Sequence, residues 1–388
     1  MPGFCFLSTL EPFMKAIVFS ESKQITSNLY PFTLMRPVQD IRIGIFTIRE
    51  KWERVLGVTA FKKDGILEGP LYYIECNVIP DKGFAGRAKE LKKGEALIDD
   101  DGKILAALIE PKHLKNKKIV PEKSFVIKNV VKVAYPWHIF ELNKTALAFD
   151  FELLTAGRKS ARVDKSNAIT GKENIFIEQG AILRSCIINA EEGPVYIGKN
   201  AVVMEGSSLR GPVSVCEKAV IKMGAKIYGA TTIGPGCVVG GEVKNAVLFE
   251  HSNKAHDGYL GDSVIGAWCN LGAGTSNSNL KNTAAEIDVH LRGKKIRAGL
   301  KCGVLMGDFS RTAINTSINT GTVIGVSANV FGMGLTPGEI PSFSWGFNKP
   351  VKYRLDKALE DAGRWKALKG QIMSENEIQL LKHIYKTS

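Results

Sequence analysis

An aliphatic residue recurs at every sixth position along part of the second half of this chain. Glycine, alanine and serine crowd the positions between these aliphatic residues. An α-helix would repeat near 3.6 residues and a plain strand at 2, so neither structure explains the spacing. A period of six indicates a coil with three short faces, whose inward side chains need neighbouring coils to complete a core. The unbroken series is Ile197, Val203, Leu209, Val215, Ile221, Ile227, Ile233 and Val239.

The same series begins earlier and returns later in the chain. Ile177 and Leu183 precede it, separated from the rest by a two-residue insertion. Ile318, Ile324 and Val330 resume the spacing after a long interval. We therefore predict a left-handed parallel β-helix of hexapeptide repeats over residues 171–345.

The first part of the chain has a different character, because only 10 of the 39 glycines fall within residues 1–165. Strand and helix patterns alternate there, which indicates an α/β domain over residues 14–165. The predicted strands and helices are Ala16–Phe19, Thr47–Leu56, Leu71–Ile74, Phe84–Leu91, a hairpin of Ala96–Ile98 with Ile104–Ile109, and one longer helix at Trp137–Leu154.

The chain ends in a segment rich in charge. Val351–Leu368 and Glu375–Ile384 each combine apolar residues at helical spacing with charged residues on the other side. We predict two amphipathic helices here, which form a helical tail over residues 346–388.

Composition limits the classes of partner. The formal charge is +13, from 52 basic and 39 acidic residues, but the basic residues are spread along the chain. A solvated surface explains this balance, phosphorylated small molecules and coenzyme A are the next interpretation, and nucleic acid comes last. Seven cysteines without a C-x-x-C pair predict reduced thiols in a cytoplasmic protein, with no zinc site.

Targeting signals are also missing from the sequence. No apolar run reaches the length of about 18 residues that a membrane-spanning helix needs. Residues 1–13 lack a basic segment and a small-residue cleavage site, which predicts no secretory signal peptide. We therefore expect a cytoplasmic protein without a membrane partner.

A group of residues inside the repeat resembles a known family. Glu242-Val243-Lys244, His256-x-x-Tyr259-Leu260-Gly261-Asp262, Asn270-Leu271-Gly272-Ala273-Gly274-Thr275 and Asn279 follow one another at fixed spacing. They resemble the acetyltransferase domain of bifunctional glucosamine-1-phosphate acetyltransferase / N-acetylglucosamine-1-phosphate uridyltransferase. The resemblance covers roughly residues 171–335 and implies acetyl-CoA as co-substrate.

The resemblance also implies roles for single residues. His256 corresponds to the general base that takes a proton from the sugar amine, and the histidine pKa of about 6.5 suits that task. Lys244 and Tyr259 correspond to sugar-phosphate ligands, and Lys226 stands where the family has an arginine. The remaining implied site residues are Asn270 and Asn279 at the sugar and acyl site, and Gly272, Ala273 and Gly274 as the backbone of an oxyanion and coenzyme site.

Departures from the family pattern leave the acceptor sugar and the acyl group open. Asp257-Gly258 stands where the family has Leu-Thr after the histidine, and Leu280 replaces a tyrosine. The stretch Lys281–Leu300 is longer than in the bacterial enzymes and carries several basic residues. Asn270 also suits an internal asparagine ladder of a β-helix, so both interpretations stand.

The N-terminal part resembles sugar-phosphate nucleotidyltransferases through Leu29-Tyr30-Pro31-Phe32-Thr33 and Arg36-Pro37. This resemblance implies nucleotide binding, for which Arg36 and Arg42 are the candidates, and a divalent metal such as Mg²⁺. The family's glycine-rich loop has no counterpart at 20–28. Its metal-binding aspartate is also missing, with Glu75 or Asn77 nearest.

Three hypotheses follow. In the first, the β-helix acetylates an amino-sugar phosphate and the N-terminal domain makes the nucleotide sugar. In the second, only one half is catalytic and the N-terminal domain is a scaffold. In the third, the protein binds sugar nucleotides without catalysis. Because hexapeptide acyltransferases of this family form their sites between β-helices, the resemblance also implies a homotrimer.

Overall fold

A computed structural model of the chain describes residues 16–60, 69–115 and 118–388. The prediction about residues 1–13 therefore lies outside the described residues. The described residues divide into two compact units, which we treat separately. The sheet unit comprises the chain up to Ser20 and Arg49–Lys132, and the β-helix unit comprises Glu21–Ile48 and Val133–Ser388.

Among its described residues, the sheet unit contains a five-stranded sheet with the order β1-β4-β6-β5-β9. β1 and β4 run parallel, whereas β6 is antiparallel to both β4 and β5. The predicted hairpin is confirmed, with Gly102 N–H donating to the Asp99 carbonyl in its turn. The sheet strands are β1 (Ala16–Ser20), β4 (Leu71–Glu75), β5 (Glu95–Ile98), β6 (Ile104–Ile109) and β9 (Lys123–Val126).

Helices α2 (Ile48–Leu56) and α3 (Lys82–Glu90) follow the predicted pattern. The indole of Trp52 is fully buried, lies edge-on to Phe84 at 5.5 Å between ring centroids, and donates to the Val78 carbonyl. This contact joins the two helices through their apolar faces. The predicted α/β architecture of the N-terminal part is therefore confirmed.

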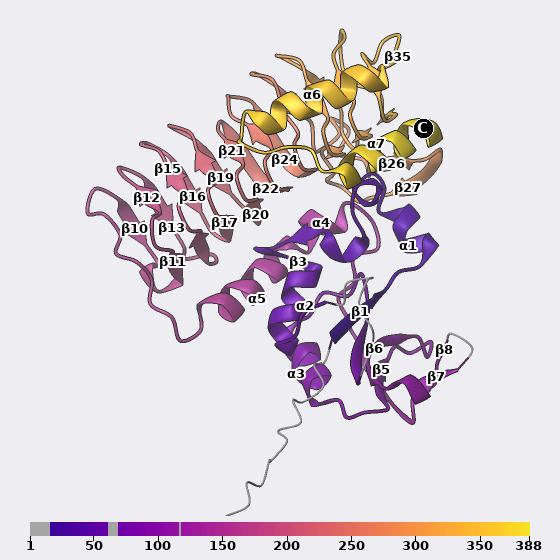
Figure 1. Ribbon diagram of the computed structural model, residues 1–388. Coiled ribbons are helices and arrows are strands. Elements are labelled where there is room, and N and C mark those ends of the chain that lie inside the picture. The colour runs from indigo at the N-terminus through magenta and orange to yellow at the C-terminus, as the bar shows by residue number, and fades with distance from the viewer. Residues whose placement is uncertain (1–15, 61–68, 116–117) are drawn as a thin grey trace, which may run out of the picture. The chain divides into compact units, whose positions relative to one another are not determined.

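Apart from the antiparallel hairpin of Asp288–Leu291 and Lys294–Arg297, the strands of residues 168–345 lie on three faces of a parallel β-helix (Figure 1). Each face stacks strands from successive coils in parallel register. Face A contains β10 (Ala168–Thr170), β13 (Ile187–Asn189), β16 (Ser208–Arg210) and β19 (Lys226–Tyr228). Face B contains β11 (Ile175–Ile177), β14 (Val195–Ile197), β17 (Val213–Val215), β20 (Thr231–Ile233), β28 (Leu305–Met306), β31 (Val323–Ile324) and β33 (Glu339–Ile340).

The longer strands β22 (Glu242–Leu248) and β24 (Tyr259–Ile265) continue faces A and B. A further parallel pair joins β25 (Ser276–Asn277) and β30 (Ser317–Ile318). Face C contains β12 (Ile182–Leu183), β15 (Val202–Val203), β18 (Val220–Ile221), β21 (Val238–Val239) and β23 (Asn253–Lys254), with β29 (Arg311–Thr312), β32 (Asn329–Val330) and β34 (Ser344–Trp345) in later coils.

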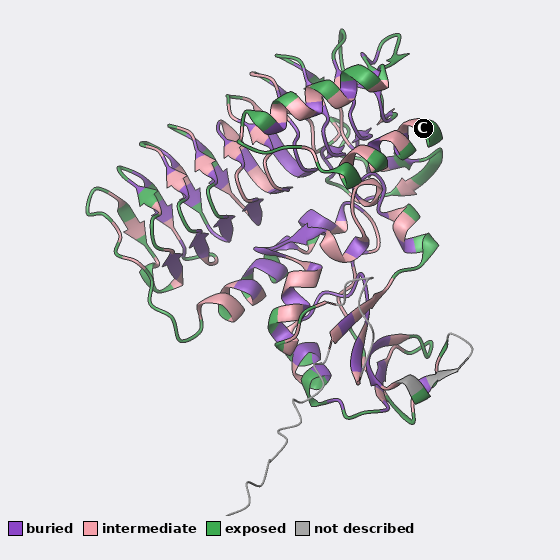
Figure 2. Cartoon of the chain, viewed as in Figure 1, coloured by how far each residue is buried: buried purple, intermediate pink, exposed green. Residues whose placement is uncertain are grey.

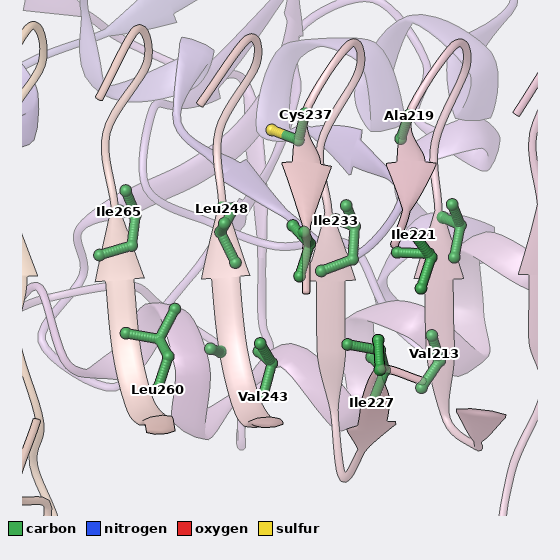
Figure 3. Packing of buried hydrophobic residues seen from close by; sticks show 14 of the residues in the cluster. Val213, Ala219, Ile221, Ile227, Ile233, Cys237, Val243, Leu248, Leu260 and Ile265 are labelled. Carbon is green, nitrogen blue, oxygen red and sulfur yellow. The ribbon is translucent and has the colours of Figure 1, made fainter. Parts of the chain in front are cut away.

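The period of six is confirmed by the strand register. On face C, Val203 pairs with Ile221 and Ile221 with Val239. The paired residues are 18 apart in sequence, so three periods of six residues make one complete coil. All the residues of the unbroken series are at most 1% exposed. Figure 3 shows Ile221, Ile227 and Ile233 of this series among the core side chains, and Figure 2 shows buried residues along the strands. Stacking thus supplies the core that a single coil lacks.

The predicted long helix at Trp137–Leu154 is wrong in one respect. The chain forms α4 (His138–Glu141) and α5 (Asn143–Thr155), which are interrupted at Leu142 (φ −86°, ψ −4°). Leu147 of α5 joins a small core with Phe176 and Tyr196 of the β-helix. The apolar pattern of the helix does not reveal this interruption.

The C-terminal segment also differs at its start. Val351–Lys352 forms strand β35, antiparallel to β34, before α6 (Leu355–Ala367) begins. Helix α7 (Glu375–Thr387) starts with a capping box between Ser374 and Glu377, and Glu377 also accepts Lys366 Nζ of α6 at 2.6 Å. Figure 1 shows α6 running across the later coils of the β-helix. In the described ranges, no helix is long and apolar enough to cross a bilayer.

Candidate functional site

The turn at residues 255–258 presents His256 at a corner between faces C and A. It lies between β23 and β24, and the histidine is exposed. Glycines on both sides allow the close stacking of this turn: a Cβ at Gly241 would lie 2.9 Å from the His256 carbonyl oxygen, and one at Gly258 would lie 2.1 Å from the Thr275 carbonyl oxygen. The imidazole makes no hydrogen bond within the described part of the chain, so it is available to a ligand.

A pocket of about 520 Å³ borders this turn. His256, Asn270 and Ala273 contribute from the β-helix, together with the exposed Ile314 of a later coil. Trp365 of α6 closes another side. The wall therefore combines an imidazole, the side-chain amides of two asparagines and a lysine with a large apolar surface, a combination typical of small-molecule sites.

The glycine-rich turn at 272–274 is already hydrogen-bonded to its neighbours. Gly272 N–H donates to the Thr312 carbonyl and Oγ1, and Gly274 N–H donates to the Asp257 carbonyl at 3.0 Å. No acceptor for the Ala273 amide occurs among the described residues. The role of Gly272, Ala273 and Gly274 as oxyanion donors stays a prediction, with the Ala273 amide best placed for it.

Asn270 fits both of the interpretations that the sequence left open. Its Oδ1 accepts the Asn253 side chain at 3.4 Å, which makes a short asparagine ladder on face C. The same residue lines the pocket beside His256. Its predicted role as a substrate ligand remains to be tested.

Face A gathers the predicted phosphate ligands. In strand register, Lys226 pairs with Glu242, and Glu242 pairs with Tyr259. Lys244 lies two residues along β22 from Glu242, in register with Tyr228, and its ammonium is 5.7 Å from the centre of the Tyr228 ring. Lys226 is exposed, whereas Lys244 and Tyr259 are partly buried.

A network of side chains surrounds Tyr259. Asn279 Nδ2 donates to the Tyr259 hydroxyl at 3.1 Å and to the Asp262 carboxylate, which also accepts Asn245 Nδ2 at 2.6 Å. Burial raises the pKa of Tyr259, and nearby Asp262 adds to the effect. Asp262 had no role in the sequence interpretation, although it ends the Tyr-Leu-Gly-Asp segment. It fixes Asn279 and thereby Tyr259.

The sequence also did not indicate that helix α6 and the residues after it border the pocket. Lys369 Nζ donates to the carbonyls of Gly236 (2.8 Å) and His251 (2.9 Å) and to Asn253 Oδ1 (3.0 Å). Burial lowers the pKa of Lys369. These bonds hold the tail against face C, where Trp365 borders the pocket. Amphipathic spacing predicted the helix but not the surface that it covers.

Arg36 and Arg42 make contacts inside the β-helix unit. The Arg36 guanidinium forms a two-pronged pair with the Asp308 carboxylate, lies 3.7 Å from Glu250 and covers the Phe249 ring at 4.9 Å. Arg42 is buried and donates to the Ile45 carbonyl. Nucleotide binding by either residue stays a prediction.

Glu75 and Asn77, the residues nearest to the expected metal position, are both buried. The Glu75 carboxylate is 3% exposed and accepts Lys103 Nζ at 2.6 Å, so an ammonium already neutralises it. Within the described ranges, no group of three or more His, Cys, Asp or Glu residues could hold a metal ion. Because Mg²⁺ usually keeps several waters and binds one or two carboxylates together with substrate phosphates, its binding here stays a prediction.

Comparisons with known proteins agree with the two-part architecture. Residues 16–159 match a family model described as sugar nucleotidyl transferase. A bifunctional sugar-1-phosphate nucleotidylyltransferase/acetyltransferase of Sulfurisphaera tokodaii is 34% identical over 231 residues, covering 57% of this chain and 48% of that protein. A bifunctional protein GlmU of Methanococcus maripaludis strain C5 is 27% identical, covering 56% of this chain and 47% of the relative.

Among solved structures, UDP-N-acetylglucosamine acyltransferase of Francisella novicida is 16% identical, with a TM-score of 0.30 over 58% of this chain and 84% of that one. The chain spans about half the length of the curated relatives that it matches. The nucleotidyltransferase match at the N-terminal end and the sequence relationship to these bifunctional proteins lead to one conclusion. Over parts of its length the chain is similar to bifunctional sugar-phosphate nucleotidyltransferases/acetyltransferases.

Proposed function

We propose that this protein transfers an acetyl group from acetyl-CoA to the amine of an amino-sugar phosphate. The main support is the pocket beside His256, which combines an unbonded imidazole with an apolar wall from Trp365 and Ile314. An apolar wall suits the pantetheine part of a thioester, and an exposed imidazole suits a general base.

The reaction is a single acyl transfer. The neutral amine attacks the thioester carbon, a C–N bond forms, and the C–S bond breaks. His256 takes the proton released by the amine and passes it to the departing thiolate, so that free coenzyme A leaves as a thiol. The Ala273 amide supports the oxyanion that forms between these steps. Lys226, Lys244 and Tyr259 hold the sugar phosphate on face A, around the corner from the pocket.

A thiol-release assay with acetyl-CoA and glucosamine-1-phosphate tests this function. His256→Ala should lower kcat by at least about 100-fold, the usual contribution of a general base. His290→Ala is the matched control, because His290 is an exposed histidine on the hairpin β26 (Asp288–Leu291) and β27 (Lys294–Arg297). Equal release from both variants and the wild type would refute the assignment of His256. No release with any amino-sugar phosphate or acyl donor would favour a binding protein without catalysis.

We propose a second activity, nucleotidyl transfer, for the part of the chain that includes residues 16–159. The family match supports it. The pairing of Arg36 with Asp308 instead favours a scaffold role for the segment around it. A pyrophosphate-release assay with several nucleotides and sugar phosphates decides between them: turnover of any pair rejects the scaffold, and sugar-nucleotide binding without turnover supports it.

We also propose a homotrimer, in which face A of one β-helix completes the site of its neighbour. Light scattering should give three times the chain mass of 42.3 kDa. A mass equal to one chain would contradict the trimer.

A further inference from the structure

A lysine interrupts the aliphatic core of the β-helix directly below the His256 turn. On face C, Val203, Ile221 and Val239 pair in register, and the next residue of this ladder is Lys254. Its side chain is 1% exposed, so the ammonium lies inside the coil. The strand register therefore puts a cation where three earlier coils have an aliphatic side chain.

The ammonium is held by main-chain oxygens. Lys254 Nζ donates to the Gly240 carbonyl at 3.2 Å and to the His256 carbonyl. Burial lowers the pKa of Lys254 to about 8, and the nearby charge of Asp257 opposes the shift without cancelling it. A buried charge without an ion pair destabilises a fold, so an aliphatic residue would serve the core better.

The carbonyls that Lys254 binds belong to the stacked turns of the site. Gly240 N–H donates to the Lys254 carbonyl at 2.7 Å, and a Cβ at Gly240 would lie 2.4 Å from the Ala255 oxygen. The ammonium therefore ties two successive turns together from inside the coil. On the outside of the upper turn, the His256 side chain faces the pocket.

We propose that Lys254 is a positioning residue for His256: its ammonium binds the His256 carbonyl from inside the β-helix and so fixes the turn that presents the imidazole to the acyl acceptor. This inference rests on the proposed function of His256 as the general base. Lys254 touches no substrate, and it acts through the main chain of the turn. The buried charge destabilises the core, and in this proposal its function is to hold the turn that carries His256 in place.

Steady-state thiol release by Lys254→Met tests the inference, because methionine fills the space of the lysine stem without the ammonium. A displacement of about 1 Å at a catalytic group costs about 100-fold in rate. We therefore expect kcat to fall between about 10-fold and 100-fold, with KM for both substrates changed by less than about threefold. Ile221→Met is the matched control, since it puts the same side chain on the same ladder, two coils away, and should retain wild-type kcat.

Hydrogen exchange of the amides of residues 255–258 provides a readout that does not depend on activity. We expect faster exchange in Lys254→Met than in Ile221→Met, and an intermediate rate in Lys254→Gln, which keeps a neutral donor. Equal exchange in Lys254→Met and the control would overturn the positioning role, as would an unchanged kcat. If the wild type releases no thiol, the proposed function fails, and the exchange rates still decide whether Lys254 fixes the turn. Should Lys254→Met not fold, Lys254→Gln takes its place in both measurements.

Discussion

Replacing Arg36 by alanine should strongly destabilise the β-helix unit. Asp308 is 2% exposed, and its carboxylate would lose both prongs of the guanidinium while keeping only the Ala267 N–H at 3.3 Å. Removing one partner of a buried ion pair costs about 3–5 kcal/mol. Loss of the contact with Phe249 adds about 0.5–1 kcal/mol. We expect a loss of about 5 kcal/mol in the free energy of unfolding.

The opposite change should cost less. In Asp308→Ala, Arg36 keeps Glu250, whose carboxylate lies 3.7 Å from its guanidinium. Arg36 is also 12% exposed, so water can solvate part of the charge. The double variant Arg36→Met with Asp308→Leu should recover much of the loss, because apolar residues can replace a buried pair.

Urea unfolding followed by far-UV circular dichroism measures these differences. The matched control is Arg158→Ala. Arg158 also makes a two-pronged pair, with Glu178 at 2.9 and 2.7 Å, but its side chain is 43% exposed. An exposed pair contributes at most about 1 kcal/mol. If Arg36→Ala costs no more than Arg158→Ala, burial does not decide the strength of this pair and the reasoning is refuted.

Three further predictions concern the core and the pocket. Burial lowers the pKa of Lys254 to about 8 from an ordinary 10.5, so its charge opposes folding below pH 8, and this penalty disappears as the pH rises to 10.5. The free energy of unfolding of the wild type should therefore rise by up to about 3 kcal/mol relative to that of Lys254→Met over this range. A difference between the two that stays constant with pH in urea unfolding would contradict this prediction. Trp365→Ala should raise KM for acetyl-CoA more than it lowers kcat, whereas an unchanged KM would remove α6 from the donor site. Ile227→Ala should lower the free energy of unfolding by about 2–5 kcal/mol, because a fully buried ladder position leaves a cavity, and a loss below 1 kcal/mol would be inconsistent with this packing.

The β-helix could be predicted from the sequence because each coil repeats the same physical requirement. An inward position must be aliphatic wherever coils stack, so the spacing from Ile197 to Val239 records the fold directly. The role of His256 was predicted from the resemblance of its motif to a known acetyltransferase family. The sequence did not reveal Lys254 as an inward position of the ladder. It lies 15 residues after Val239, which is not a multiple of six, although the two residues pair in the strand register.

Tertiary structure alone decided which distant segments cover the β-helix. Arg36 and Asp308 lie 272 residues apart, and no local sequence pattern links this arginine to a buried carboxylate. Trp365 likewise reaches the pocket only because the tail returns to face C, where Lys369 donates to the carbonyls of Gly236 and His251. Local spacing determines what a segment forms, since propensity and periodicity act over a few residues. Which surfaces then meet depends on complementary shape and charge between segments far apart in the chain.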